Sequence, residues 1–150
     1  MIARLLHLTA RTGPPARLLS RAHARLYAAT RGRALGRWFG GAPVIVLETT
    51  GRRTGRRRAT TVICVRDGGR YLVCAANAGA DPMPAWCLNL RASGSGTVVD
   101  GGRRVRVRPR ELRGDEREDA WRRFAGRYPA LDDYARYTQR RFPLVWLEPE

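Results

Sequence analysis

The chain has 150 residues and a formal net charge of +16, and arginine is its only strongly basic residue because it contains no lysine. This length suits one domain with one hydrophobic core. No apolar run is long enough to span a membrane, no signal peptide is evident, and the three cysteines lack the spacing of a metal site, so we expect a cytoplasmic protein without a bound metal.

Residues 1–42 form a basic arm, because the first acid in the chain is Glu48. An apolar stripe at helical spacing lies beside a row of arginines: Leu18, Leu19, Ala22 and Leu26 beside Arg17, Arg21 and Arg25. This amphipathic helix fits two roles. It packs on the domain or on a second subunit, or it lies on an anionic membrane surface. The second role would place the protein peripherally on the inner face of the cell membrane.

Residues 43–150 alternate short apolar runs with turn signals and are expected to form one domain. Strands are predicted at 44–50, 59–66, 71–76, 97–100, 104–108 and 144–147. Glycine pairs at 68–69 and 101–102 predict hairpins. Helices are predicted at 84–91, at 115–126 with Asp115 and Glu118 as a capping box, and at 131–140. Short antiparallel strands with helices outside them predict an α+β fold built on a small closed barrel.

The turn after the first predicted strand is the most distinctive feature of the chain. Residues 51–58, hereafter the arginine turn, contain five arginines and two glycines. Gly51 and Gly55 allow positive φ and close backbone approach, so exposed N–H groups and guanidiniums can converge on a phosphate or on several carboxylates. The turn alone fits an unliganded, solvated hairpin tip equally well. It is not a Walker loop, because no Lys-Ser/Thr pair follows the second glycine.

A second loop, 77–81, follows a buried strand and is made mostly of small residues that let a flat ring system approach the backbone. Trp86, in the helix that follows, either lines that pocket or packs in the core, which is the commoner position for a lone helical tryptophan. Both histidines lie in the arm and no pair of carboxylates stands out. We therefore expect a bound cofactor, rather than a side-chain triad or a zinc ion, to supply the chemistry.

Together these loops resemble the deazaflavin-dependent nitroreductase family, small oxidoreductases known from actinobacteria that use coenzyme F(420) and include quinone reductases. The resemblance runs from about Pro43 to Pro149 and rests on three motifs: Thr49-Thr50-Gly51-Arg52-Arg53-Thr54-Gly55, then Asn77-Ala78-Gly79-Ala80 with Trp86 and Asn89, then Tyr128-Pro129 with Tyr134 and Thr138. It implies a split β-barrel of the flavin-reductase, FMN-binding type with flanking helices.

The resemblance also implies residue roles. Arginines and a threonine of the turn match positions that grip the coenzyme's phosphate and polyglutamate tail: Arg52, Arg53, Thr54 and Arg58. Positions along the deazaflavin ring are matched by Ala75, Ala76, Asn77, Ala78, Trp86 and Asn89. Tyr128, Tyr134 and Tyr137 match the aromatic wall of the acceptor pocket, where Tyr134 is our candidate proton donor and Asn77 a second catalytic candidate. A tyrosine that only packs its helix on the barrel is an equally good interpretation of Tyr134.

These matches predict a reductase that transfers a hydride from reduced F(420) to an electron-poor acceptor such as a quinone or a nitro or enone compound. Asn77 replaces the serine of the best-studied nitro-prodrug activators, and Cys87 replaces a frequent tyrosine, so the acceptor range is open. One alternative is an FMN-binding split barrel, although one phosphate does not need so many arginines. The other is a non-enzymatic protein that binds nucleic acid or a membrane surface through its charge. No nucleic-acid-binding motif is present, so no nucleic-acid partner is expected.

Overall fold

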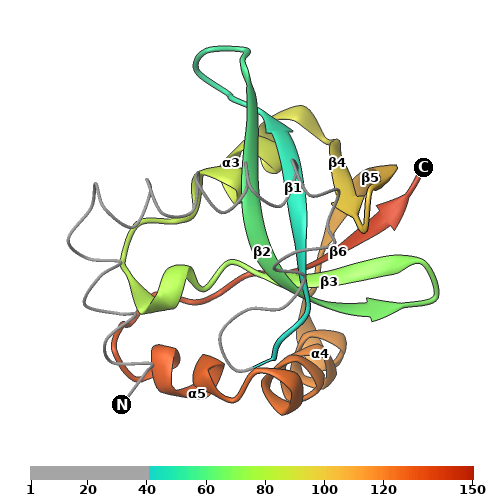
Figure 1. Cartoon of the computed structure of the whole chain (residues 1–150). Helices are drawn as coiled ribbons and strands as arrows, with labels where there is room; N and C mark the ends of the chain where they lie inside the picture. The colour runs from blue at the N-terminus through green and yellow to red at the C-terminus, as the bar shows by residue number, and fades with distance from the viewer. Residues whose placement is uncertain (1–40) are drawn as a thin grey trace.

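The computed structural model describes residues 41–150, so the predicted helix of the arm and both histidines lie outside the described part of the chain. Six strands form a closed antiparallel barrel in the order β1-β2-β3-β6-β5-β4 (Figure 1). Their bounds are β1 Val44–Thr50, β2 Arg57–Asp67, β3 Arg70–Cys74, β4 Gly96–Asp100, β5 Arg103–Glu111 and β6 Leu144–Pro149. Within residues 41–150, no helix has both the length and the apolar character that a membrane crossing requires.

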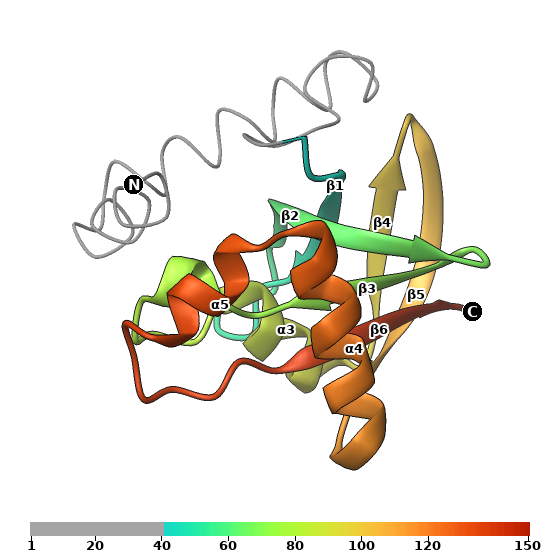
Figure 2. The same ribbon diagram turned by 90° about the horizontal axis from the view of Figure 1, so that it is seen from below.

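Within residues 41–150, three helices and one short turn lie outside the barrel. α3 (Ala85–Ser93) packs against β1, whereas α4 (Gly114–Arg127) and α5 (Ala130–Ala135) lie together on another side, where α4 contacts β2, β3 and β6 (Figure 2). A single turn, η1 (Asn77–Gly79), joins β3 to α3 and contacts α5. Sequence-distant segments therefore meet at η1.

The hydrophobic core has two main parts. One fills the barrel and its α3 side and includes Ile45, Leu47, Val73, Trp86, Leu90, Val98 and Leu147. The other lies under α4 and α5 and includes Leu72, Phe124, Leu131, Tyr134, Phe142 and Trp146. Burial of these apolar surfaces supplies the main driving force for the fold.

The predicted α+β barrel is confirmed, with the strands near their expected places. Both hairpins turn on glycine pairs with positive φ, at Gly68-Gly69 and Gly101-Gly102. β5 continues beyond the predicted end through Pro109 to Glu111. Proline is tolerated there because β4 pairs with β5 only as far as Val107, so Pro109 has a single neighbouring strand.

Two helix predictions were wrong in detail. The capping box at Asp115 and Glu118 is not formed, because α4 begins one residue earlier, with Arg113 as N-cap and no side-chain cap. The helix predicted at 131–140 ends at Ala135. After it the chain turns toward the loop before α3, where Thr138 and Arg140 form tertiary hydrogen bonds that a continued helix would forgo.

Candidate functional site

The arginine turn is a tight connection between β1 and β2. The N–H of Gly51 donates to Arg56 O at 2.8 Å and the N–H of Gly55 donates to Gly51 O at 2.7 Å. Gly55 has a φ of +65°, and a Cβ added at Gly51 would lie 2.8 Å from Thr54 Oγ1. Gly55 therefore provides the positive φ that the sequence suggested, while Gly51 provides the close approach.

Among residues 41–150, four of the five guanidiniums of the turn have no carboxylate partner. In the described part of the chain, no carboxylate lies within 4.0 Å of Arg52, Arg53, Arg56 or Arg58, and Arg57 lies 3.7 Å from a Glu48 carboxylate that Arg104 already binds at 2.6 Å. The arginines on the outer face of β5 have partners instead: Arg104 with Glu48, Arg106 and Arg108 with Glu150, and Arg110 with Glu116 and Glu148. The pairing separates arginines that neutralise the barrel's own acids from a cluster that is free to bind an external anion.

A buried amide connects the arginine turn to α3. Asn89 Oδ1 accepts the backbone N–H of Arg52 at 3.1 Å, and Asn89 Nδ2 donates to Thr49 Oγ1 at 3.1 Å. The Asn89 side chain is 3% exposed. The structure therefore places this predicted cofactor residue beneath the turn, where its polar atoms fix the backbone that presents the arginines.

The second predicted loop follows β3 and has an unusual backbone. Ala75 and Ala76 are buried, and the next three residues all have positive φ: 49° at Asn77, 50° at Ala78 and 77° at Gly79. For asparagine and alanine this left-handed conformation costs energy and persists only where the surroundings hold it. Asn77 Nδ2 donates to Pro82 O at 3.1 Å and closes the loop on itself.

Trp86 lies in the barrel core with 6% of its surface exposed, so the core interpretation describes its position. Cys87, which stands at the frequent tyrosine position, is also buried, and burial raises the pKa of its thiol. The replacement of the family's frequent tyrosine by Cys87 therefore changes how α3 packs on the barrel, and does not change an exposed pocket wall. The contact of Trp86 with a cofactor stays a prediction.

The structure divides the three predicted acceptor-side tyrosines into a pair and a single residue. The hydroxyls of Tyr128 and Tyr134 lie 2.7 Å apart, and Tyr134 is 3% exposed in the core under α4 and α5. Burial is the main cause that raises the pKa of Tyr134, and the hydrogen bond with Tyr128 raises it further. The phenol of Tyr134 thus stays protonated at neutral pH. Its role as proton donor stays a prediction.

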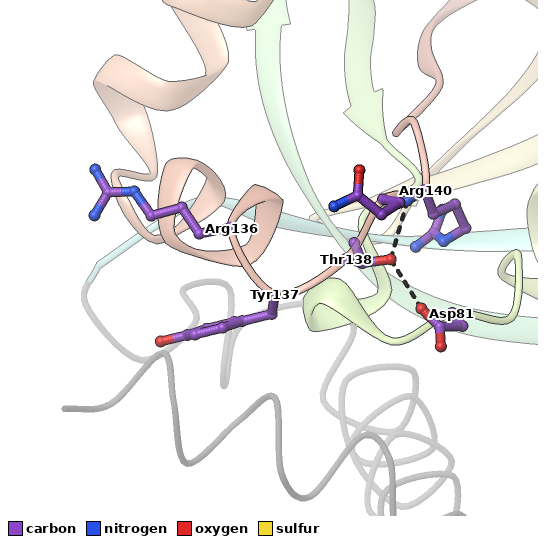
Figure 3. A pocket seen from close by; sticks show the side chains of 6 residues that line it. Asp81, Arg136, Tyr137, Thr138 and Arg140 are labelled. Carbon is purple, nitrogen blue, oxygen red and sulfur yellow. Dashed lines mark hydrogen bonds between the residues drawn. The ribbon is translucent and has the colours of Figure 1, made fainter.

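Tyr137 is 38% exposed and borders an open hollow of about 400 Å³ together with Asp81 and Thr138 (Figure 3). Its ring extends away from the hydrogen bond, 2.8 Å long, that Thr138 Oγ1 donates to Asp81 (Figure 3). This hollow lies between the segment after α5 and Asp81 of the second loop, so it brings a predicted acceptor residue next to that loop.

Arg140 was not among the predicted site residues, yet its guanidinium donates hydrogen bonds to the backbone carbonyls of Ala75, Ala76 and Ala80. The sequence does not indicate which of the adjacent Arg140 and Arg141 contacts the loop, because this depends on which side chain points inward in the folded protein. In residues 41–150, no three His, Cys, Asp or Glu residues lie together as a metal site would need.

Several known proteins resemble this chain in sequence and in fold. The sequence profile described as F(420)H(2)-dependent quinone reductase matches residues 19–149, and so extends into the predicted arm. An F(420)H(2)-dependent quinone reductase of Mycobacterium tuberculosis is 32% identical over 135 residues, which cover 86% of this chain and 89% of that relative.

Two solved structures are also similar. A structure described as an F(420)-H2 dependent reductase is 31% identical, with a TM-score of 0.65, and the match covers 71% of this chain and 94% of the other. A chain described as a domain-swapped dimer is 27% identical, with a TM-score of 0.68, and the match covers 90% of this chain and 100% of the other.

Proposed function

This chain belongs to the F(420)H(2)-dependent quinone reductase family, and from this membership we propose that it reduces a quinone at a site formed by the arginine turn, the second loop and the Tyr137 hollow. It is an oxidoreductase whose cofactor is coenzyme F(420). The acceptor and the residue roles are the proposed part.

The residues present fit this coenzyme. A phosphodiester followed by glutamates carries several anionic oxygens, and the turn offers four exposed arginines without a carboxylate partner among residues 41–150. This unpaired cluster is the observation that carries the proposal. α3 connects the two halves of the site, because it begins after the second loop and its Asn89 holds the turn.

When bound, the reduced deazaflavin supplies a hydride. The chain's part is to hold the tail with Arg52, Arg53, Thr54 and Arg58 and to present to the ring the small residues 75–78, which lead from β3 into the second loop. Fixing the reactants in this way lowers the entropy cost of reaching the transition state.

Reduction of a quinone to a hydroquinone by a hydride also takes up one proton. We assign its delivery, or the stabilisation of the product anion, to Tyr134 directly or through a water. Within residues 41–150 the Tyr134 hydroxyl is hydrogen-bonded to the Tyr128 hydroxyl, so a proton from Tyr134 would leave along this pair. Tyr137 is assigned to the acceptor wall, and Asn77 to the edge where loop and acceptor meet.

Nitro and enone compounds are secondary candidate acceptors. Asn77 is exposed and its amide is bound to Pro82 O, so it presents a larger and more polar side chain than a serine would. We expect this to alter which acceptors fit, while the binding of the coenzyme tail is unaffected because the turn is held by Asn89 of α3 and not by the second loop.

The test is a titration of the purified protein with F(420), FMN and duplex DNA, followed by anaerobic oxidation of F(420)H2 by menadione, a simple quinone. We expect tight binding of F(420), weak binding of FMN, and loss of the deazaflavin signal only when protein and quinone are both present. Tight FMN binding without F(420) binding would favour the flavin alternative. Salt-sensitive DNA binding with neither cofactor would instead favour the nucleic-acid alternative.

A further inference from the structure

Arg140 lies in the segment between α5 and β6 and reaches across to the second loop. Its Nη1 donates to Ala75 O at 2.9 Å, its Nη2 donates to Ala76 O at 2.7 Å and to Ala80 O at 3.0 Å, and its Nε donates to Ala80 O at 3.1 Å. One guanidinium therefore binds carbonyls at both ends of the loop, across residues 77–79 with positive φ.

The charge of Arg140 is satisfied by peptide dipoles. Within residues 41–150 no carboxylate lies within 4.0 Å of it, and its guanidinium carbon lies 4.8 Å from the centre of the Phe142 ring. The side chain is half-buried, and burial is the first cause that lowers its pKa. Partial burial of a cation costs free energy unless its N–H groups are hydrogen-bonded. The hydrogen bonds to the loop carbonyls therefore stabilise the half-buried position of the Arg140 guanidinium.

The carbonyls need the arginine in return. Left-handed residues turn the peptide planes of the loop out of any sheet or helix ladder, and the loop is closed internally by Gly79 N–H donating to Ala76 O at 2.9 Å and Ala80 N–H donating to Asn77 O at 3.0 Å. Buried carbonyls are paired in native proteins, and here Arg140 provides the donors for those of Ala75 and Ala80.

We propose that Arg140 is a positioning residue that holds the 75–80 loop in its left-handed conformation for the deazaflavin ring. This rests on the proposed function. Thr138 supports the same link, because its hydroxyl donates to Asp81 and accepts the backbone N–H of Arg140 at 3.0 Å. The segment that carries Tyr137 and the loop that faces the ring therefore form one unit, which fixes the acceptor wall relative to the cofactor.

The proposal predicts two effects of Arg140→Gln and Arg140→Lys, with Arg141→Gln as the matched control. Lysine keeps the charge but lacks the planar fork that reaches three carbonyls. In the cofactor-free protein, hydrogen exchange of a peptide covering residues 76–82 should become faster in both Arg140 variants, while exchange in β4 and β5 stays unchanged. The Arg141 variant should exchange like the wild type, because Arg141 is exposed.

The second effect separates the loop from the arginine turn. The variants are titrated with F(420) and with the tail-free chromophore, a deazaflavin that lacks the phosphate and the glutamates. Arg140→Gln should weaken both ligands by the same factor, about 10- to 100-fold, because a misplaced loop affects the ring in either case. Arg53→Ala with Arg58→Ala should weaken F(420) alone. Low millimolar guanidinium should restore binding of the chromophore to Arg140→Ala, and equal sodium chloride should not.

Wild-type exchange in residues 76–82 of the Arg140 variants would overturn the proposal, and so would unchanged affinity for the tail-free chromophore. If Arg140→Gln does not fold, Arg140→Lys and the guanidinium rescue decide the question. If the wild type binds neither ligand, the proposed function fails, and the exchange measurement still decides whether Arg140 holds the loop.

Discussion

Exposed arginines in this chain differ by whether a carboxylate lies within reach. On the outer face of β5 they alternate with buried or half-buried residues and bind glutamates of β1, β6 and α4 and the C-terminal Glu150. Such surface pairs contribute little stability each. Apart from Arg57, which lies 3.7 Å from Glu48, the arginines of the turn have no such partners among the described residues, which leaves their donors available for a polyanionic ligand.

We expect Arg53→Ala with Arg58→Ala to weaken F(420) binding by about 2–4 kcal/mol, because each change removes a charge-assisted contact with the tail. Raising the salt concentration should weaken the wild type more than the double variant. Fluorescence titration measures both effects. Arg122→Ala with Arg127→Ala on α4 removes the same charge far from the turn and serves as the control. Equal affinities in the two double variants would show that only net charge matters.

Tyr134→Phe removes one hydroxyl and keeps the ring. If the hydroxyl donates a proton or a hydrogen bond in the transition state, single-turnover oxidation of bound F(420)H2 by menadione should slow by roughly 10- to 1000-fold, with F(420) affinity unchanged. If Tyr134 only packs, turnover stays at the wild-type rate. The free energy of unfolding then falls by about 1 kcal/mol, because the Tyr128 hydroxyl loses its partner. Solvent water would become the proton source.

The same tyrosine makes stability sensitive to alkaline pH. Burial raises the pKa of Tyr134 above its usual value of 10.0 in the folded state. Above about pH 10 the unfolded chain therefore loses this proton while the folded chain keeps it, so the free energy of unfolding should decline from that pH upward and be constant with respect to this group below it. Urea unfolding across this range should show a shallower decline for Tyr134→Phe. If the free energy of unfolding fell equally steeply with pH in both proteins, the raised pKa of Tyr134 would not be the cause of the decline.

At the level of elements, α3 determines how the site is assembled. It follows the second loop directly, and Asn89 near its middle joins the end of β1 to the first arginine of the turn. The hydrogen bonds of Asn89 thus connect α3 to the turn, in addition to the apolar packing of α3 on the barrel.

This link can be measured with a double-mutant cycle of Thr49→Val and Asn89→Ala. Asn89→Ala should lower the free energy of unfolding by about 1–3 kcal/mol, because it leaves the part-buried N–H of Arg52 and the buried hydroxyl of Thr49 without their partner. Part of that loss should vanish in the Thr49→Val background, with a coupling of about 1 kcal/mol. Strict additivity in urea unfolding would mean that the two side chains act independently.

At the scale of the whole molecule, the net charge of +16 is compatible with attachment to an anionic membrane surface. The family profile begins at residue 19, within the arm, so this part of the chain is shared with relatives. Its apolar stripe beside arginines still predicts contact with anionic lipid, and a packing role stays open.

We expect the full chain to co-sediment with vesicles of anionic lipid and a chain without residues 1–30 to do so less, because basic residues near such a surface each add attraction. Vesicles of neutral lipid provide the control. Equal sedimentation of the two chains, or failure of the shorter chain to fold, would identify the arm as a structural element.

The sequence by itself determined the barrel and the polar composition of the site. Alternation in β5, the apolar β1 and the glycine pairs are local signals, because each reports whether a residue faces the core or adopts a positive φ. The arginine turn and the small-residue loop were visible for the same reason: their chemistry is contained in consecutive residues.

Only the tertiary structure decided which of these polar residues act on each other. The pairing of Tyr128 with Tyr134, the place of Asn89 beneath the turn and the reach of Arg140 to the carbonyls of the second loop join positions up to 65 residues apart. The end of α5 was also decided there, since the hydrogen bonds of Thr138 and Arg140 to the loop outweigh the helical pattern of 131–140. Propensity acts over a few residues, whereas these contacts form only once the barrel has brought the segments together.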